Sequence, residues 1–141
     1  MKIETYEKTI RVEDYIEGYV CVDEFLEMCK ACENYNRKWS CPSYDFDPVE
    51  DYWKTFEQLY IVGKKMILEE EDKENWQALM KEVKAELTRE LAEKEKDYPG
   101  SQALSAGSCQ VCGEDNCTRK TGEPCRFPDK MRYSVESLGG N

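Results

Sequence analysis

Cysteine content most constrains how this chain can fold, because its 141 residues include eight cysteines and no histidine. Four of the cysteines lie close together near the C-terminus, in the pattern C-x2-C-x4-C-x7-C from Cys109 to Cys125. Thiols at this density serve as disulfides, as metal ligands or as redox groups. Which of these uses applies decides the class of protein.

The expected compartment makes disulfides the least favoured of these uses. Residues 1–8 mix acids with bases and lack the apolar stretch of a secretory signal. No apolar run approaches the roughly 20 residues that span a bilayer. We therefore expect a cytoplasmic protein, in which glutathione and thioredoxin keep thiols reduced, and the metal interpretation gains accordingly.

The charge of the chain limits its partners. A formal net charge of −10 argues against nucleic acid and against anionic membranes, because binding to phosphates relies on Lys and Arg. Residues 109–141 differ from the rest, since their five bases balance their five acids. Bases beside the cysteines would offset the negative charge of thiolates, although the local balance is also compatible with chance.

The order of predicted elements indicates an α+β fold in a single metal-binding domain spanning residues 1–141. Residues of β type within 1–22 predict one or two strands, with Gly18 as a turn. The apolar run over 59–68 predicts a buried strand. These strands would form a small mixed or antiparallel sheet.

One long and two or three short helices are expected around that sheet. The long helix runs over 74–98, and its exposed face pairs Glu90 with Lys94 at i, i+4. A short helix with Asp23 as its cap carries an apolar stripe and ends near the first cysteines.

Two further helix starts lie on either side of the cysteine-rich loop segment. Asp47 precedes Pro48, a pattern in which Asp caps the backbone and Glu50 completes a capping box. A last helix is expected to begin near Pro128 and to end at 139–140, where two glycines follow each other.

Seven of the eight cysteines lie among turn-forming residues. An N-terminal motif over 29–42 has the pattern C-x2-C-x8-C-P, and a C-terminal motif occupies 107–128. Gly and Asn in such turns let two sulfurs converge on one metal and point backbone N–H groups at them. Cys21 lies between two valines instead, which predicts a small buried apolar residue. If both motifs serve one centre, the fold must bring residues 29–41 beside residues 109–125.

The identity of the metal stays open between two choices. Four sulfurs from one short segment can saturate either Zn²⁺, at about 2.3 Å, or one iron–sulfur cube. Structural zinc sites usually pair two C-x2-C turns, and the C-terminal motif has one. Unequal ligand spacings and the Cys41–Pro42 pair favour iron–sulfur. The three thiols of the N-terminal motif would leave a metal with an open position, or one motif is structural and the other serves chemistry.

Two signatures in the chain resemble those of a known family. One is CKACENYNRKWSCP over 29–42, and the other combines GSC at 107–109 with GEPCRFP at 122–128 and RYSVESLG at 132–139. Both are similar to signatures of a prokaryotic family of cysteine-rich, predicted metal-binding proteins of unknown function. The resemblance covers most of the chain and names no reaction.

The resemblance implies a cytoplasmic metalloprotein and leaves Cys21 outside the ligand set. Members of the family usually have C-x2-C-x2-C in the C-terminal motif, so residues 113–116 include a two-residue insertion here. They also tend to continue beyond position 141, where a further strand would cover the strand at 59–68; without it, that sheet edge calls for a partner. The implied metal ligands are Cys29, Cys32, Cys41, Cys109, Cys112, Cys117 and Cys125.

Other chemistry has less support. Without histidine there is no Ser-His-Asp or Cys-His base. The acids at 69–72 are expected to be solvated loop faces and helix caps. Arg126 either donates to a cluster or an anionic substrate, or pairs on the surface with Glu123 or Asp129. Three aromatic residues between the cysteines either shield a metal or belong to the core: Tyr35, Trp39 and Tyr44.

Three functions follow from these observations. The first is an iron–sulfur protein, with a 4Fe–4S cluster on the C-terminal cysteines, which acts in electron transfer or as an accessory to a redox enzyme. The second is a zinc-stabilised protein-interaction module without catalytic activity. The third is an enzyme with an open metal site. In each case we expect a protein partner, either a redox partner or a second copy, and neither nucleic acid nor membrane.

Overall fold

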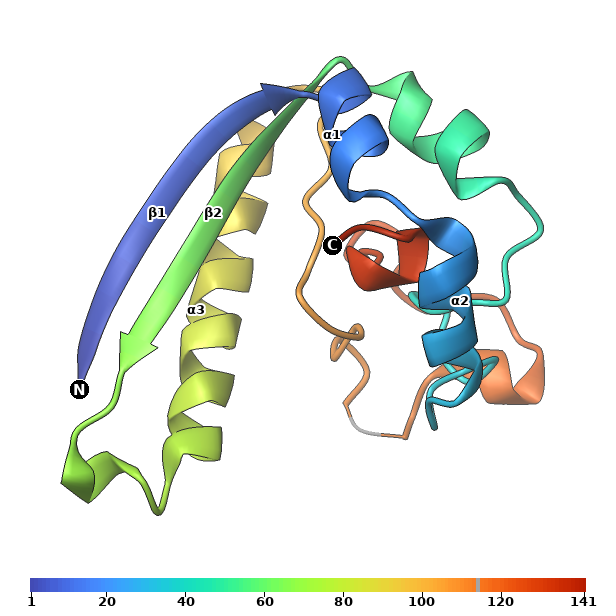
Figure 1. Cartoon of the computed structure of the whole chain (residues 1–141). Helices are drawn as coiled ribbons and strands as arrows, with labels where there is room; N and C mark the ends of the chain where they lie inside the picture. The colour runs from blue at the N-terminus through green and yellow to red at the C-terminus, as the bar shows by residue number, and fades with distance from the viewer. Residues whose placement is uncertain (114) are drawn as a thin grey trace. The chain divides into compact units, whose positions relative to one another are not determined.

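The computed structural model describes residues 1–113 and 115–141 and divides the chain into two compact units. The strand unit comprises Met1–Arg11 and Gln58–Ala103, and the cysteine unit comprises Val12–Glu57 and Leu104–Asn141. All eight cysteines belong to the cysteine unit. The predicted α+β class is confirmed (Figure 1). That all 141 residues form one domain stays a prediction.

The strand unit contains a two-stranded antiparallel sheet. Strand β1 (Lys2–Arg11) pairs along its whole length with β2 (Gln58–Ile67). The predicted strand at 59–68 is therefore confirmed in place, but the expectation that it is buried is wrong. Its side chains alternate between half-buried and exposed from Tyr60 onward, which is the pattern of a sheet with one covered face.

Helix α3 (Trp76–Lys96) is the long helix, and Figure 1 shows it alongside the sheet. The predicted ion pair between Glu90 and Lys94 is wrong, because both side chains contact β2. Glu90 lies 3.7 Å from the ammonium of Lys64, and the Lys94 ammonium lies 3.9 Å from the centroid of the Tyr60 ring. Contacts of α3 with the sheet thus replace the pair expected along the helix.

The cysteine unit begins with helix α1 (Val12–Tyr19). Of the one or two strands predicted within residues 1–22, one is formed as β1, and the alternative of a second strand with a turn at Gly18 is wrong because burial follows a helical period. Val12 and Tyr15, three residues apart, are 2% and 4% exposed. The Tyr15 ring packs against Trp53 with centroids 5.2 Å apart. A strand would place these two side chains on opposite faces of a sheet.

Helix α2 (Val22–Lys30) confirms the short helix before the first cysteines, but it begins at Val22 and Asp23 is not its cap. The residue at the cap position is Cys21, whose side chain makes no capping hydrogen bond. Cys21 is exposed, so the prediction of a buried apolar residue is wrong. Its backbone is held instead, since its N–H donates to the Gly139 carbonyl at 2.9 Å.

The predicted cap at Asp47 is confirmed. Its Oδ1 accepts the N–H groups of Val49 and Glu50 at 2.9 and 3.0 Å, at the start of a π-helical turn, Pro48–Tyr52, that leads into a 3-10 turn, Trp53–Thr55. Glu50 does not complete the box, because its carboxylate pairs with Lys54 at 2.6 Å. The Asp51 carboxylate, which accepts from the Asp47 N–H at 2.8 Å, completes it.

The acids at 69–72 also behave as predicted. Glu69 precedes the 3-10 turn that the other three form, Glu70–Asp72, and the side chains of Glu69 and Asp72 form a reciprocal capping box there. This is the role of a helix cap rather than of a catalytic pair.

The core of the cysteine unit is built on Trp53 and Leu138, which are 2% and 0% exposed. The Trp53 indole N–H donates to the Leu138 carbonyl at 2.9 Å, so its polar edge is satisfied within the core. A second group of rings continues from there, with centroid separations of 4.7–5.8 Å among Tyr44, Phe46, Tyr52 and Tyr133.

The helix predicted from Pro128 is not formed, and the described chain there has only a 3-10 turn, Glu136–Leu138. Serine side chains compete with the helical backbone at this point: Ser134 Oγ accepts the Ser137 N–H at 3.1 Å, and Ser137 Oγ donates to the Ser134 carbonyl at 2.7 Å. The predicted stop is confirmed, because Gly139 ends the turn with a left-handed φ of 84°.

Candidate metal centre

All four cysteines of the C-terminal motif line one cavity of the cysteine unit. The cavity has a volume of about 20 Å³. Apolar side chains make up much of the rest of its wall, and the buried Lys38 lies among them. The thiols and the main apolar neighbours are Cys109, Cys112, Cys117, Cys125, Trp39, Val111, Phe127 and Met131.

Tight turns bring these thiols to the same place. After Cys112, Gly113 has a left-handed φ of 84° and donates its N–H to the Gln110 carbonyl at 3.0 Å. After Cys117, the 3-10 turn Thr118–Thr121 ends at Gly122, whose φ is 76°. The Thr118 hydroxyl then donates to the Pro124 carbonyl at 2.9 Å, which closes the loop that leads to Cys125. Gly113 and Gly122 thus adopt the left-handed conformations that were expected of turn residues beside the cysteines.

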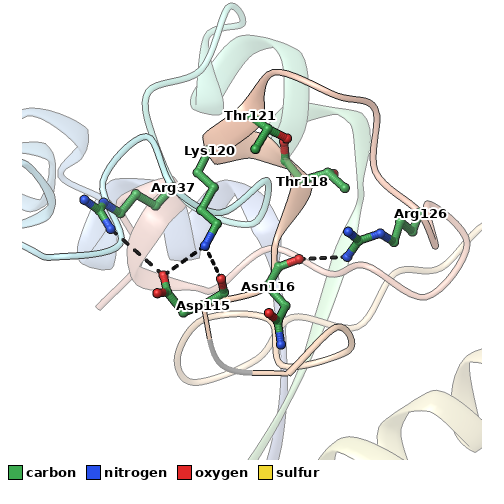
Figure 2. Close-up of polar contacts among 7 residues, drawn as sticks. All are labelled: Arg37, Asp115, Asn116, Thr118, Lys120, Thr121 and Arg126. Atoms are coloured by element: carbon green, nitrogen blue, oxygen red, sulfur yellow. Dashed lines mark hydrogen bonds and ion pairs between the residues drawn. The ribbon is translucent and has the colours of Figure 1, made fainter.

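Basic side chains hold the segment between Cys112 and Cys117, as Figure 2 shows. The Asp115 carboxylate lies 3.6 Å from Lys120 and 4.0 Å from Arg37, and residue 114 of the predicted insertion lies outside the described residues. These pairs are exposed, so each adds little stability. Arg126 donates to the Asn116 carbonyl at 2.8 Å, not to either predicted acid.

The three cysteines of the N-terminal motif differ in exposure. Cys29 near the end of α2 is half-buried, Cys32 is exposed, and Cys41 is 8% exposed. The Cys32 N–H donates to the Cys29 carbonyl at 3.0 Å, and the Asn34 N–H points at the Cys32 sulfur at 3.5 Å. This is the turn geometry expected of a C-x2-C motif, with an N–H group directed at sulfur.

Burial controls the protonation of this group. Desolvation raises the pKa of the Cys29 thiol, and the neighbouring thiols Cys41 and Cys32 raise it further. Desolvation also raises the pKa of Cys41, while its contact with Ser40 acts in the opposite direction. The three thiols are therefore electrostatic neighbours, and metal binding has to displace their protons.

The two cysteine motifs lie beside each other, which is the arrangement that a metal centre served by both motifs would need. Ser40 connects them, because its hydroxyl accepts the Cys109 N–H at 3.0 Å and lies 3.6 Å from the Cys41 sulfur. The Lys38 ammonium, in a side chain 5% exposed, donates to the Cys109 carbonyl at 3.0 Å. The positive charge of Lys38 acts against the rise that burial causes in the pKa of Cys41.

The three aromatic residues between the cysteines have different positions. Trp39 lines the cavity and donates its indole N–H to the Thr118 hydroxyl at 3.1 Å and to the Glu123 carbonyl at 3.2 Å. Tyr44 belongs to the ring cluster of the core, and burial raises its pKa well above its ordinary value. Tyr35 is half-buried. Of the two roles expected from the sequence, the position of Trp39 suits the shielding of a metal, whereas Tyr44 belongs to the core.

Two basic residues of the site, Lys38 and Arg119, had no role in the sequence prediction. The charge balance of residues 109–141 includes Arg119 without distinguishing it from the other bases there, and it does not include Lys38. Only the contacts do so: Lys38 lies against the Cys109 backbone, and Arg119 donates to the backbone around Cys41.

The donor chemistry of the cavity fits a thiophilic metal. Thiolates bind Zn²⁺ and iron–sulfur clusters in preference to hard cations, and the apolar wall limits the access of water. The sulfur atoms line the cavity without forming a coordination shell, because within residues 1–113 and 115–141 no three Cys, Asp or Glu side chains are grouped closely enough to hold a metal ion. The cavity and the motif turns bring the donors together, and binding would draw them closer.

Residues 15–141 match the family model of the predicted metal-binding proteins called DUF2284. The chain belongs to this family. The resemblance seen in the sequence is thereby confirmed, and metal binding is supported at the level of the family. No curated protein and no solved structure matches the chain. In the part of the chain that the structure describes, no helix combines the length and the apolar character needed to cross a bilayer.

Proposed function

We propose that this DUF2284 protein is a cytoplasmic iron–sulfur protein in which four cysteines hold one 4Fe–4S cluster. The single observation that carries this proposal is that all four thiols of the C-terminal motif line one cavity. Four thiolates are the ligand set of a cubane cluster. The ligands of that cluster would be Cys109, Cys112, Cys117 and Cys125.

The surroundings of the cavity suit such a cluster. Trp39, Phe127 and Met131 provide an apolar wall, which lowers the exposure of a cluster to water. The buried ammonium of Lys38 offsets part of the negative charge that thiolates bring. Both features tune the stability and the potential of a bound cluster.

The proposed role is electron transfer, or support of a redox enzyme, with a redox partner or a second copy as the protein partner. A cluster without a second cofactor carries electrons more readily than it makes or breaks bonds. The other three thiols, Cys29, Cys32 and Cys41, would hold a second metal at their own group. Neither nucleic acid nor a membrane is a proposed partner, in view of the net charge of −10.

A zinc-stabilised protein-interaction module without catalytic activity is the second candidate, and the size of the cavity favours it. A volume of about 20 Å³ accommodates a single ion with less rearrangement than a cube of eight atoms. Four thiolates can also saturate Zn²⁺ in a structural site. In that case the metal supplies folding free energy, and the surface of the protein performs the function.

Metal and sulfide analysis of protein purified without oxygen separates the two candidates. Brown protein that contains iron and acid-labile sulfide, with broad visible absorbance that is lost on exposure to air, is the result expected of the cluster. Colourless protein with zinc close to stoichiometric, and with neither iron nor sulfide, would replace the cluster by the zinc module. Protein without bound metal under both zinc and iron supplementation would contradict both.

A further inference from the structure

Arg119 belongs to the C-terminal motif but contacts the loop that carries Cys41. It lies two residues after Cys117, on the 3-10 turn Thr118–Thr121. Its guanidinium donates to three backbone carbonyls and one side-chain amide oxygen of the other motif, so both of its terminal nitrogens are used. The acceptors are the carbonyls of Lys38, at 3.1 Å, Cys41 and Ser43, and Oδ1 of Asn36, at 3.2 Å.

The acceptors are held in place by the loop itself. Asn36 closes the loop by donating its N–H to the Pro42 carbonyl at 2.8 Å and by accepting the Ser43 N–H and hydroxyl at 2.9 and 2.6 Å. Carbonyls arranged in this way match the planar, five-donor fork of a guanidinium, which an ammonium cannot reproduce. The contact therefore specifies arginine and not positive charge alone.

Trp39 attaches the same two segments a second time. The Arg119 guanidinium carbon lies 5.2 Å from the centroid of the Trp39 ring, and the indole N–H donates to Thr118, the neighbour of Arg119. Ser40 adds a third attachment at the other end of the C-terminal motif, through the Cys109 N–H. The loop of Cys41 is thus fixed to the turn of Cys117 on one side and to Cys109 on the other.

We propose that Arg119 is a positioning residue that couples the two cysteine groups, so that metal at one group strengthens metal binding at the other. A metal at the C-terminal group fixes Cys117 and the turn that follows it, and through Arg119 it fixes the backbone of Cys41. The N-terminal group then binds metal with a smaller ordering cost, and by thermodynamic linkage the effect is reciprocal. The inference rests on the proposed function only in requiring that both groups bind metal.

Alkylation of the thiols during a Zn²⁺ titration, mapped by mass spectrometry, tests the coupling. In the unmodified protein, Zn²⁺ should protect both groups and leave Cys21 reactive. The C-terminal group, with four thiols, should fill with Zn²⁺ before the group of three. Arg119→Lys keeps the charge but loses the planar set of donors, so it should leave the C-terminal thiols protected at the original Zn²⁺ concentration. The thiols at positions 29, 32 and 41 should then require more Zn²⁺, by about 5- to 150-fold, the usual range of coupling between sites.

Arg89→Lys is the matched control, because this arginine is exposed on α3 in the strand unit, which contains none of the cysteines. It should titrate like the unmodified protein.

A second experiment tests the coupling without changing Arg119. Cys125→Ser weakens metal binding at the C-terminal group, so it should raise the Zn²⁺ concentration that protects Cys41. In the Arg119→Lys background the same substitution should change the protection of Cys41 by a smaller factor, since Arg119 no longer contributes to the link.

The outcomes separate the inference from the proposed function. Protection of neither group in the unmodified protein would sink the proposed metal centre, and the coupling with it. Protection of both groups, with Arg119→Lys titrating like the unmodified protein or with Cys125→Ser leaving Cys41 unaffected, would overturn the coupling alone. Loss of protection of all seven thiols together in Arg119→Lys, with a lowered unfolding midpoint, would assign Arg119 a merely structural role.

Discussion

The surroundings of a cysteine decide what its thiol can do, and single residues of this chain differ widely in this respect. Cys112 lines the cavity together with three other thiols. Cys21 is exposed at the start of α2, and its described hydrogen bonds involve its backbone, with Gly139 and Phe25 as partners. Among the described residues, the cavity and the turns therefore distinguish candidate ligands from a cysteine with another role.

Serine substitution tests this distinction at the residue scale. Cys112→Ser should lower the metal content of anaerobically purified protein substantially, because a hydroxyl is a much poorer ligand for zinc or for iron–sulfur than a thiolate. Cys21→Ser is the control and should leave the metal content unchanged. Metal analysis per folded protein measures both, and equal losses in the two variants would contradict the assignment of the ligands.

At the scale of elements, the cysteine unit depends on a close approach between the C-terminal turn and α2. A Cβ atom on Gly139 would lie 2.8 Å from the Cα of Val22 and 2.9 Å from its backbone nitrogen. Gly139 also has a φ of 84°, in the left-handed region. The position therefore requires glycine for two independent reasons.

Alanine substitution should separate these two reasons. Gly122→Ala, at a φ of 76° with nothing within 4 Å of the new Cβ, should cost about 1–2 kcal/mol of unfolding free energy through the left-handed conformation alone. Gly139→Ala should cost more, because the turn or α2 must also move. Urea unfolding of the metal-free variants measures the difference, and equal losses would show that the approach to Val22 is not tight.

At the scale of the whole molecule, burial of weak acids gives the stability a dependence on pH. Desolvation raises the pKa of Cys29 and Cys41 above their ordinary value of 9.0, and that of Tyr15 and Tyr133 above 10.0. The pKa of the half-buried Tyr44 is raised for the same reason. The folded state thus holds these protons more tightly than the unfolded state does, so their contribution is complete below the unfolded values and is lost as pH rises.

The metal-free protein should therefore lose stability from about pH 9 upward. Urea midpoints measured between about pH 8 and about pH 11 should fall as pH rises. Tyr44→Phe should make the fall above about pH 10 shallower, whereas Tyr98→Phe, at an exposed position, should not. A midpoint that stays constant or rises over this range would contradict the argument.

Much of the fold could be predicted from local patterns in the sequence. Asp47 before Pro48 specified a helix cap, and Gly139 specified the end of the last turn. Predictions failed where tertiary contacts outweighed the local pattern. Residues 12–19 fold as a helix because Val12 and Tyr15 reach the same core, and Glu90 pairs with Lys64 of β2 and not with Lys94.

The candidate site likewise has some features that local sequence patterns predict and others that only tertiary contacts reveal. The spacing of Gly and Asn among the cysteines predicts turns, and each turn is formed by residues close in sequence, so the cysteine motifs can be recognised without a structure. The roles of Lys38 and Arg119 cannot be recognised in this way. Their partners lie about 70 to 80 residues away along the chain, and no local pattern encodes a contact of that separation.

The sequence by itself determined the two cysteine motifs, the family and the α+β class, because thiol spacing, turn residues and periodicity are local properties. Only the tertiary structure decided that Ser40, Trp39 and Arg119 join the two motifs, and that four thiols line one cavity. The physical reason is that hydrogen bonds between distant segments depend on how the chain folds back, which the residues around each cysteine do not specify.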